Sequence, residues 1–172
     1  MQHLSGGLPS FTIVGLPEAA VRESRERVRS ALINSGFDFP PRRITVNLAP
    51  ADLPKQGGRF DLPIALGILA ASGQLGSAGL DLPGEYLGEL GLGGELRAVP
   101  GVLPAVLAAG ELNRTVMLPM ANRPEASLVQ DAKLLPVASL TQARAHLTGD
   151  APNPVLTGDM SAARDAVGEW AA

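Results

Sequence analysis

RRITVNLAPADLPKQGGRFDLPIALGILAASG, residues 42–73, contains the features that decide the fold. Residues 43–48 alternate apolar and polar side chains, which is typical of a strand with one covered face. The segment that follows, up to Phe60, has neither helical nor strand periodicity, and its prolines and glycines predict a loop. The stretch therefore begins as a strand and passes through a glycine-bearing turn.

A helix is expected after that turn. From Leu62 to Ala71 nearly every side chain is apolar, and a helix that is apolar on all sides belongs in a core. Asp61 is expected to cap this helix, since carboxylates accept hydrogen bonds from the free amides of a first turn. Gly73 is expected to end it in a left-handed conformation. The other elements must then pack around residues 62–71.

The composition limits the class of protein. The chain has 172 residues, 45% of them hydrophobic and 18% charged, which is enough for one domain with a real core. Its net charge of −3 argues against a general basic coat for nucleic acid, but leaves room for a local basic patch. The chain has no cysteine, so disulfides and thiolate metal sites are excluded. We expect a cytoplasmic protein with no membrane partner, because no apolar run approaches the length of a membrane span.

The flanking sequence predicts further helices and strands. Residues 8–16 are expected to form a strand, whereas residues 1–7 are too short to be an element alone. Pro17 and Glu18 start a helix that is expected to end near Gly36. Further along, Gly93-Gly94 predicts the turn of a hairpin between residues 85–92 and 95–99, a helix spans about 101–112, and short strands cover 114–118 and 133–137.

Two helix caps are expected in the C-terminal half. Asn122 with Glu125 three residues later matches a capping box, and Ser139 with Gln142 starts a last helix. The order of elements predicts an α/β (α+β) fold with a mixed β-sheet covered by helices. We expect one domain over residues 1–148. Residues 149–172 are expected to be a linker or tail that is disordered or forms a marginal helix.

Catalytic motifs are absent from the sequence. Neither lysine follows a glycine, so no phosphate-binding loop of the GxxxxGK[ST] type exists, and no GxSxG motif is present. His3 and His146 are far apart, with no spacing that suggests a metal site. The acidic residues are explained more simply as caps and solvated strand faces than as an acid–base pair. We therefore expect no catalytic, cofactor-binding or metal-binding residue in this chain.

Arginine is the residue type that suggests a function, because guanidinium groups match phosphate oxygens. Four arginines fall within residues 22–29, two more lie directly before and at the start of the strand at 43–48, and one lies in the glycine turn. The residues expected to contact nucleic-acid phosphates are Arg22, Arg25, Arg29, Arg42, Arg43 and Arg59.

An alternative reading assigns these arginines a structural role. The helix arginines would pair with glutamates at helical spacing, as in Glu18–Arg22, Arg22–Glu26 and Glu23–Arg27. Arg59 would fold back onto Asp52 or Asp61.

Residues 5–147 resemble the N-terminal domain of the ComM/YifB family, often called magnesium-chelatase-like. The likeness is carried by GLPEAAVRESRERVRSA, PKQGGRFDLPIALG and EYLGELGLGGELRAVPGVLPAVLAA. Family members are bacterial AAA+ ATPases, among them a hexameric helicase that promotes DNA branch migration in natural transformation. The resemblance implies an earlier strand region and a following ATPase module, so that this chain is expected to be clipped at both ends. ATP and Mg would belong to that module, and the expected partners are the module, neighbouring subunits of a hexameric ring and DNA.

The same region is similar to the Lon protease domain, which shares its fold with the second domain of ribosomal protein five. Lon-type proteases use a serine–lysine dyad. Arg59 occupies the place of the serine and Leu103 that of the lysine, and neither side chain can perform the chemistry of the dyad. The resemblance thus implies a retained scaffold without protease activity.

These observations predict a non-catalytic N-terminal domain of a ComM-type AAA+ ATPase that contributes DNA, subunit or partner contacts. The main alternative is a purely structural oligomerisation module. A residual Lon-like peptidase and a true chelatase subunit are weaker alternatives.

Overall fold

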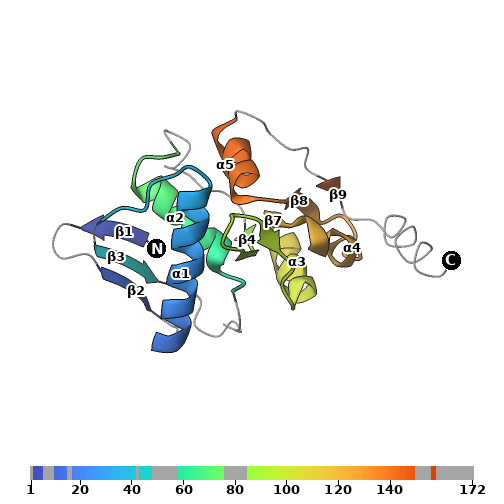
Figure 1. Ribbon diagram of the computed structural model, residues 1–172. Helices are drawn as coiled ribbons and strands as arrows, with labels where there is room; N and C mark the ends of the chain where they lie inside the picture. Colours follow the sequence, from blue (N-terminus) through green and yellow to red (C-terminus); the bar gives the residue numbers. More distant parts are fainter. Residues whose placement is uncertain are drawn as a thin grey trace.

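The computed structural model describes residues 2–5, 10–14, 17–41, 43–47, 58–75, 85–149 and 156–157. Figure 1 shows the arrangement of the helices and strands. No helix in this part of the chain is long and apolar enough to cross a membrane. The elements are β1 Gln2–Ser5, β2 Ser10–Val14, α1 Glu18–Asn34, β3 Arg43–Asn47, α2 Asp61–Ala71, β4 Glu85–Tyr86, β5 Glu89–Leu90, β6 Leu96–Arg97, α3 Val102–Glu111, β7 Thr115–Pro119, the 3₁₀ turn η2 Met120–Asn122, α4 Arg123–Ala126, β8 Lys133–Val137, α5 Leu140–Thr148 and β9 Leu156–Thr157.

The first sheet has the order β1-β3-β2, with β1 antiparallel and β2 parallel to β3. Ile44 and Val46 point from β3 into the core, whereas Arg43 is exposed. This alternation is the period of two that the sequence predicts for residues 43–48. Mixed strand directions and covering helices confirm the expected α/β class.

The second sheet has the order β4-β7-β8-β9, and its central strands β7 and β8 are parallel. Met117 of β7 packs into the same core as α2, while Val116 and Leu118 pack against α3 and α4. A parallel pair buried on both faces is the usual arrangement, because helices cover each side. The strand β9 pairs with β8 and extends this sheet beyond the expected boundary at residue 148.

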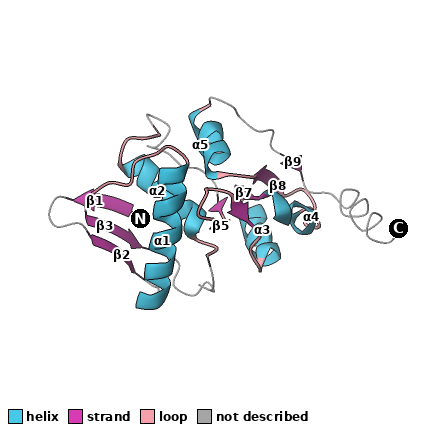
Figure 2. Ribbon diagram, viewed as in Figure 1, coloured by secondary structure: helices cyan, strands magenta, loops and turns pink. Residues whose placement is uncertain are grey.

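The expected core helix is confirmed. Leu62, Ile64 and Leu66 of α2 are at most 1% exposed, and Figure 2 shows α1 and α2 between the two sheets. Gly36 and Gly73 follow α1 and α2 with φ of +84° and +77°, which confirms both predicted helix ends.

The N-terminal strand was missed by the sequence analysis. Residues 1–7 are too short to be an element alone, but Gln2–Ser5 becomes β1 by pairing with β3. The hairpin is confirmed in shorter form, since only β5 and β6 pair. Gly94 alone in its Gly-Gly pair takes a positive φ, +91°. The first segment predicted for the hairpin, residues 85–92, is divided, because Glu85–Tyr86 pairs with β7 in the second sheet instead.

One of the two C-terminal caps is correct. Ser139 Oγ accepts a hydrogen bond from Gln142 N at 3.1 Å and caps α5. The capping box at Asn122 is wrong, because this buried side chain accepts from Val99 N and donates to Val99 O, both at 2.9 Å. A distant backbone therefore competes successfully with the local amides for the Asn122 side chain.

Several expectations fall outside the described residues. They are the loop over most of 49–60, most of the loop after Gly73, the marginal helix near the C-terminus, and the position of Arg42.

Candidate functional site

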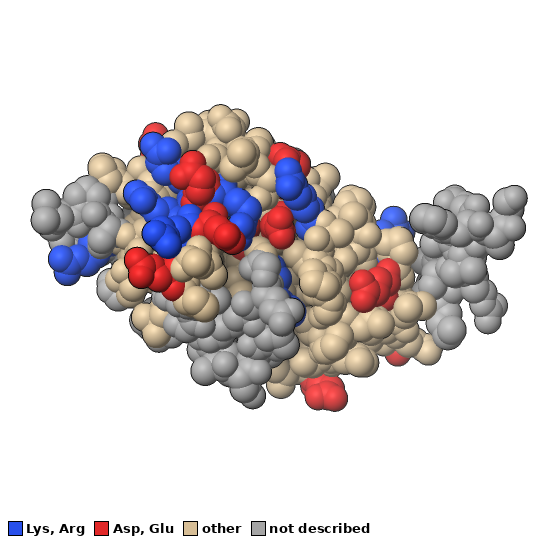
Figure 3. Space-filling view, turned by 60° about the horizontal axis from the view of Figure 1, so that its bottom comes forward, with Lys and Arg blue, Asp and Glu red and all other residues tan. Residues whose placement is uncertain are grey.

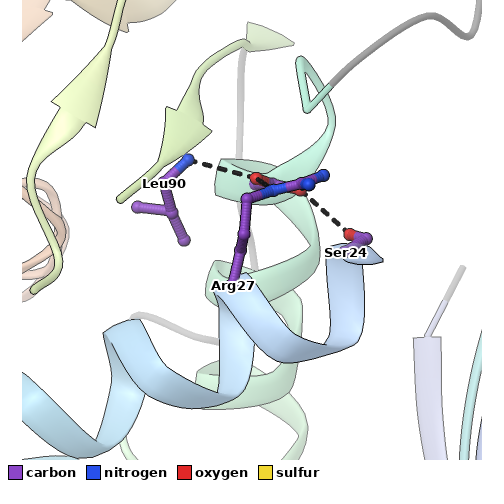
Figure 4. Close-up of polar contacts among 4 residues, drawn as sticks. Ser24, Arg27 and Leu90 are labelled. Carbon is purple, nitrogen blue, oxygen red and sulfur yellow. Dashed lines mark hydrogen bonds and ion pairs between the residues drawn. The ribbon is translucent and has the colours of Figure 1, made fainter. Parts of the chain in front are cut away.

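A buried carboxylate joins α1, α2 and β5 (Figure 4). Arg27 of α1 donates from Nε to Asp61 Oδ2 at 2.6 Å and from Nη2 to Oδ1 at 3.2 Å. Ser24 Oγ donates to Oδ1 at 2.9 Å, and the amide of Leu90 in β5 donates to Oδ2 at 3.1 Å. We call Ser24, Arg27, Asp61 and the Leu90 amide the Asp61 junction.

This geometry corrects the expectation for Asp61. The residue is the first of α2 and not its cap, and its side chain makes no capping bond. It is 1% exposed, so its charge must be compensated by long-range partners instead of water. A forked guanidinium and two further donors satisfy both carboxylate oxygens.

Burial and hydrogen bonding act against each other in the Asp61 junction. The hydrogen bond to Asp61 raises the pKa of Arg27, although partial burial opposes the change. Desolvation by burial raises the pKa of Asp61, while the donors from Arg27, Leu90 and Ser24 oppose the rise. Several hydrogen-bond partners thus hold the Arg27–Asp61 ion pair in place. Each of these groups, buried without the others, would be in an unfavourable environment.

Gly58 is packed directly against this junction. A Cβ built on Gly58 would stand 2.5 Å from Glu89 Cγ and 2.7 Å from Asp61 Oδ2. The carboxylate of Asp61 cannot retreat because its partners fix it. The second glycine of the Gly-Gly-Arg turn is therefore required by the close approach of β5 and α2.

Replacing Gly58 by alanine is expected to destabilise the protein by about 1–3 kcal/mol, because the new methyl group forces the junction apart. Urea unfolding of Gly58→Ala measures this loss. Adding Glu89→Ala removes the Cγ contact but not the Asp61 contact, so the double variant should recover only part of the loss. Full recovery would show that Asp61 moves freely, and no loss in the single variant would contradict the close packing.

Three of the predicted arginines share the outer side of α1. Arg22, Arg25 and Arg29 are spaced by three and four residues, and all are exposed. We call them the α1 arginine stripe. Among the described residues the ion pairs are Arg27–Asp61, Arg97–Glu95 and Arg114–Glu85, so none of the expected pairs along α1 forms.

The surface around the stripe has mixed charge. Figure 3 shows basic and acidic side chains interleaved on the half of the molecule built by the N-terminal elements, while the other half has few charges. Arg43 is exposed at the start of β3, and Arg42 lies outside the described residues. The structure thus groups three of the six predicted residues on one helix face and places Arg43 on a separate element.

Arg59 lies in a different environment from the stripe. Its guanidinium carbon is 5.6 Å from the centroid of the Phe60 ring, and Nη1 is 3.4 Å from the point where a Cβ on Gly101 would stand. Asp61 is committed to Arg27, and Asp52 lies outside the described residues. The two segments that resemble the Lon dyad do meet, with an arginine beside a glycine and with Leu103 half-buried in α3.

Arg27 and Ser24 are the residues that sequence reasoning undervalued. Arg27 was counted among the four arginines of residues 22–29, although it lies five residues after Arg22 and thus about 140° from it around the helix. Ser24 is a polar residue on the apolar face of α1, which is the signal that a polar partner lies opposite. Its partner, Asp61, could not be named from local sequence.

The described residues contain no group of three or more His, Cys, Asp or Glu side chains that could hold a metal ion. The carboxylate of Asp61 at the centre of the site is already bound by Arg27, so it is not available as a ligand for a cation. These residues do not fit Mg or a nucleotide bound through it.

Comparison with known proteins gives one family. The model for subunit ChlI of Mg-chelatase matches residues 2–122. The competence protein ComM of Haemophilus influenzae is 53% identical over 155 residues, covering 90% of this chain and 30% of the relative. The uncharacterized protein YifB of Escherichia coli is 49% identical over 147 residues, covering 86% of this chain and 29% of the relative. The chain thus spans less than a third of the length of these two relatives.

Proposed function

This chain belongs to the family of subunit ChlI of Mg-chelatase, with ComM and YifB proteins as relatives, and on that premise we propose that it is a non-catalytic domain of a ComM-type AAA+ ATPase that contacts DNA. The whole protein would be a DNA branch-migration helicase that acts as a hexameric ring in the cytoplasm. ATP and Mg would bind to other parts of that protein.

The α1 arginine stripe is the observation that carries this proposal. Its three guanidinium groups are exposed and have no ion-pair partner among the described residues. Arginine side chains held side by side on a helix can bind successive phosphates of a strand. The acidic residues nearby favour a few discrete contacts over a broad electrostatic surface. Arg42, Arg43 and Arg59 complete the proposed set of contacts.

The Asp61 junction supports the same proposal by fixing α1. Arg27 projects inward from the helix that carries the stripe and binds α2, while Ser24 adds a second contact one turn earlier. A helix held at two points presents its outer side chains in a constant orientation. Such a scaffold is typical of sites that bind an extended ligand.

The absence of catalysis is proposed from the identity of the side chains. Arg59 lies beside Gly101 where the two Lon-like segments meet, and Leu103 follows in α3. None of these residues can act as a serine nucleophile or its lysine base. The sequence has no phosphate-binding loop of the GxxxxGK[ST] type. A role in binding is therefore favoured over a role in hydrolysis.

Fluorescence anisotropy with labelled single-stranded and forked DNA across a salt series tests the proposal. The variant Arg22→Ala/Arg25→Ala/Arg29→Ala is expected to bind more weakly, and its plot of log K against log salt should flatten by about two units for single strands if three phosphates are lost. The control removes three exposed arginines outside α1, namely Arg97, Arg114 and Arg123, of which the first two form ion pairs. Equal weakening of DNA binding in both variants would mean that only the change in net charge matters. Unchanged binding in the stripe variant would refute the proposed contact.

A structural module is the second candidate, and exposed leucines on α3, directly after α3 and near α4 favour it. Leu107 and Leu112 are 54% and 62% exposed, and Leu128 near α4 is 47% exposed. Exposed apolar side chains are typical of protein contacts where they form a contiguous patch. If this role is the only one, the chain should assemble without measurable DNA affinity, which sedimentation and the anisotropy titration together would reveal.

A further inference from the structure

The Arg59 side chain is partly buried, and it forms no ion pair in the described part of the chain. Its guanidinium lies on the Phe60 ring, and its Nε is buried without a hydrogen-bond partner. The Arg59 carbonyl accepts a hydrogen bond from Gly88 N at 3.0 Å, so the backbone is fixed as well. A flexible surface arginine would instead extend into water, where its donors are satisfied.

The carboxylates nearest in sequence or space do not neutralise this charge. Asp61 is bound by Arg27, Ser24 and the Leu90 amide. Glu89 packs its Cγ against the position of Gly58 but is not within ion-pair distance of Arg59. The half-buried guanidinium therefore lacks an anionic partner within the described residues, which is an unfavourable state for a charge removed from water.

The tip of Arg59 lies beside the start of α3. Gly101 precedes this helix of ten residues with φ of +72°, and it has no side chain that could cap the first turn. The first turn also carries no acidic residue. Amide donors at a helix N-terminus favour an anion, so the electrostatic preference of α3 has the same sign as that of the unpaired arginine.

From this arrangement we infer that Arg59 and the first turn of α3 bind one phosphate group. The guanidinium supplies two parallel donors and the helix supplies backbone amides, a combination that matches a tetrahedral oxyanion. The site depends on the proposed function only for the molecule that carries the phosphate, which is either a DNA strand or a free nucleotide. It does not depend on the α1 arginine stripe.

Titration of the ¹⁵N-labelled chain with inorganic phosphate, followed by NMR, tests the site. Saturable shifts are expected for the amides of Gly101, Val102 and Leu103 and for the Arg59 Nε–H. In Arg59→Gln the affinity should fall at least about tenfold, because a charge-assisted hydrogen bond is lost. Arg123→Gln, which removes an exposed arginine at α4, should leave the titration unchanged.

Two further titrations identify the carrier of the phosphate. A single strand without a 5′-phosphate and ATP are added separately to the wild type, Arg59→Gln and the stripe variant. Unchanged DNA binding in the stripe variant, together with an intact phosphate titration, would refute the proposed function alone. No saturable shift at residues 101–103, or equal shifts in Arg59→Gln, would refute the Arg59 site alone. If Arg59→Gln does not fold, the location of the wild-type shifts decides: residues 101–103 support the site, and any other location overturns it.

Discussion

Replacing Arg27 by alanine is expected to destabilise the protein by about 3–5 kcal/mol near pH 7, because it leaves a buried carboxylate without its counter-ion. Asp61 is 1% exposed and cannot recover solvation without opening the contact between α1 and α2. The remaining donors from Ser24 and the Leu90 amide satisfy its oxygens only in part. Urea unfolding followed by circular dichroism measures the loss.

The loss should depend on pH in a defined direction. Burial raises the folded-state pKa of Asp61, so the contribution of this group is largest below its unfolded pKa and is lost as pH rises through the folded pKa. Removing Arg27 takes away a donor that lowers the folded-state pKa of Asp61, so this pKa rises further in the variant. The stability contributed by Asp61 is then lost over a range that extends to higher pH. The deficit of Arg27→Ala relative to the wild type is expected to be smaller near pH 5 than near pH 7.

Arg29→Ala is the matched control for this experiment, because Arg29 is exposed on the same helix and makes no ion pair with a described residue. Its effect should stay within about 0.5 kcal/mol. If Arg27→Ala cost no more than Arg29→Ala, the Asp61 junction would contribute nothing to stability and α1 would be held by apolar packing alone.

Replacing Leu66 by alanine is expected to cost about 2–5 kcal/mol, the range for a leucine removed from a well-packed core. Leu66 is 1% exposed on α2, and the residues of this helix pack against α1 and both sheets. The lost contacts therefore affect the packing of α2 against α1 and against both sheets. Denaturant unfolding gives the value. An unchanged m-value would show that unfolding still exposes the same amount of surface.

Leu107→Ala provides the comparison, since Leu107 belongs to α3 and is 54% exposed. The same chemical change should then cost well under 1 kcal/mol. Similar losses at the two positions would contradict the assignment of α2 as the central helix.

The sequence predicts those features whose causes are local. The helix at residues 62–71 follows from an unbroken apolar run, and its end follows from Gly73, which takes the left-handed conformation. Ser139 caps α5 because its partner lies three residues away. In each case the residues that decide the structure are close together in the chain, so pattern and propensity are sufficient.

Features that depend on distant partners could not be predicted in this way. Asp61 and Asn122 both match local cap patterns, yet one binds Arg27 and the other binds the Val99 backbone. The strand β1 has four residues and exists because β3 pairs with it. Sequence patterns state what a side chain can do near its own position, whereas packing decides which of several possible partners it meets.

The candidate site was anticipated in part for the same reason. The spacing of Arg22, Arg25 and Arg29 predicts a shared outer face, and all three are exposed there. Arg59 was expected in the glycine turn that precedes α2, and its guanidinium tip lies beside Gly101, which precedes α3. Whether the stripe binds phosphate stays a prediction until the binding experiment is made.

The Asp61 junction also affects how this protein can change during evolution. Ser24, Arg27 and Gly58 each contact Asp61, and they come from two separated segments, so a substitution at one position alters what the others tolerate. Single changes should therefore be rare, and lineages that lose the aspartate should lose the arginine as well. The contiguous motif GGRFD is therefore one part of a discontinuous motif, and the other part consists of Ser24 and Arg27 on α1.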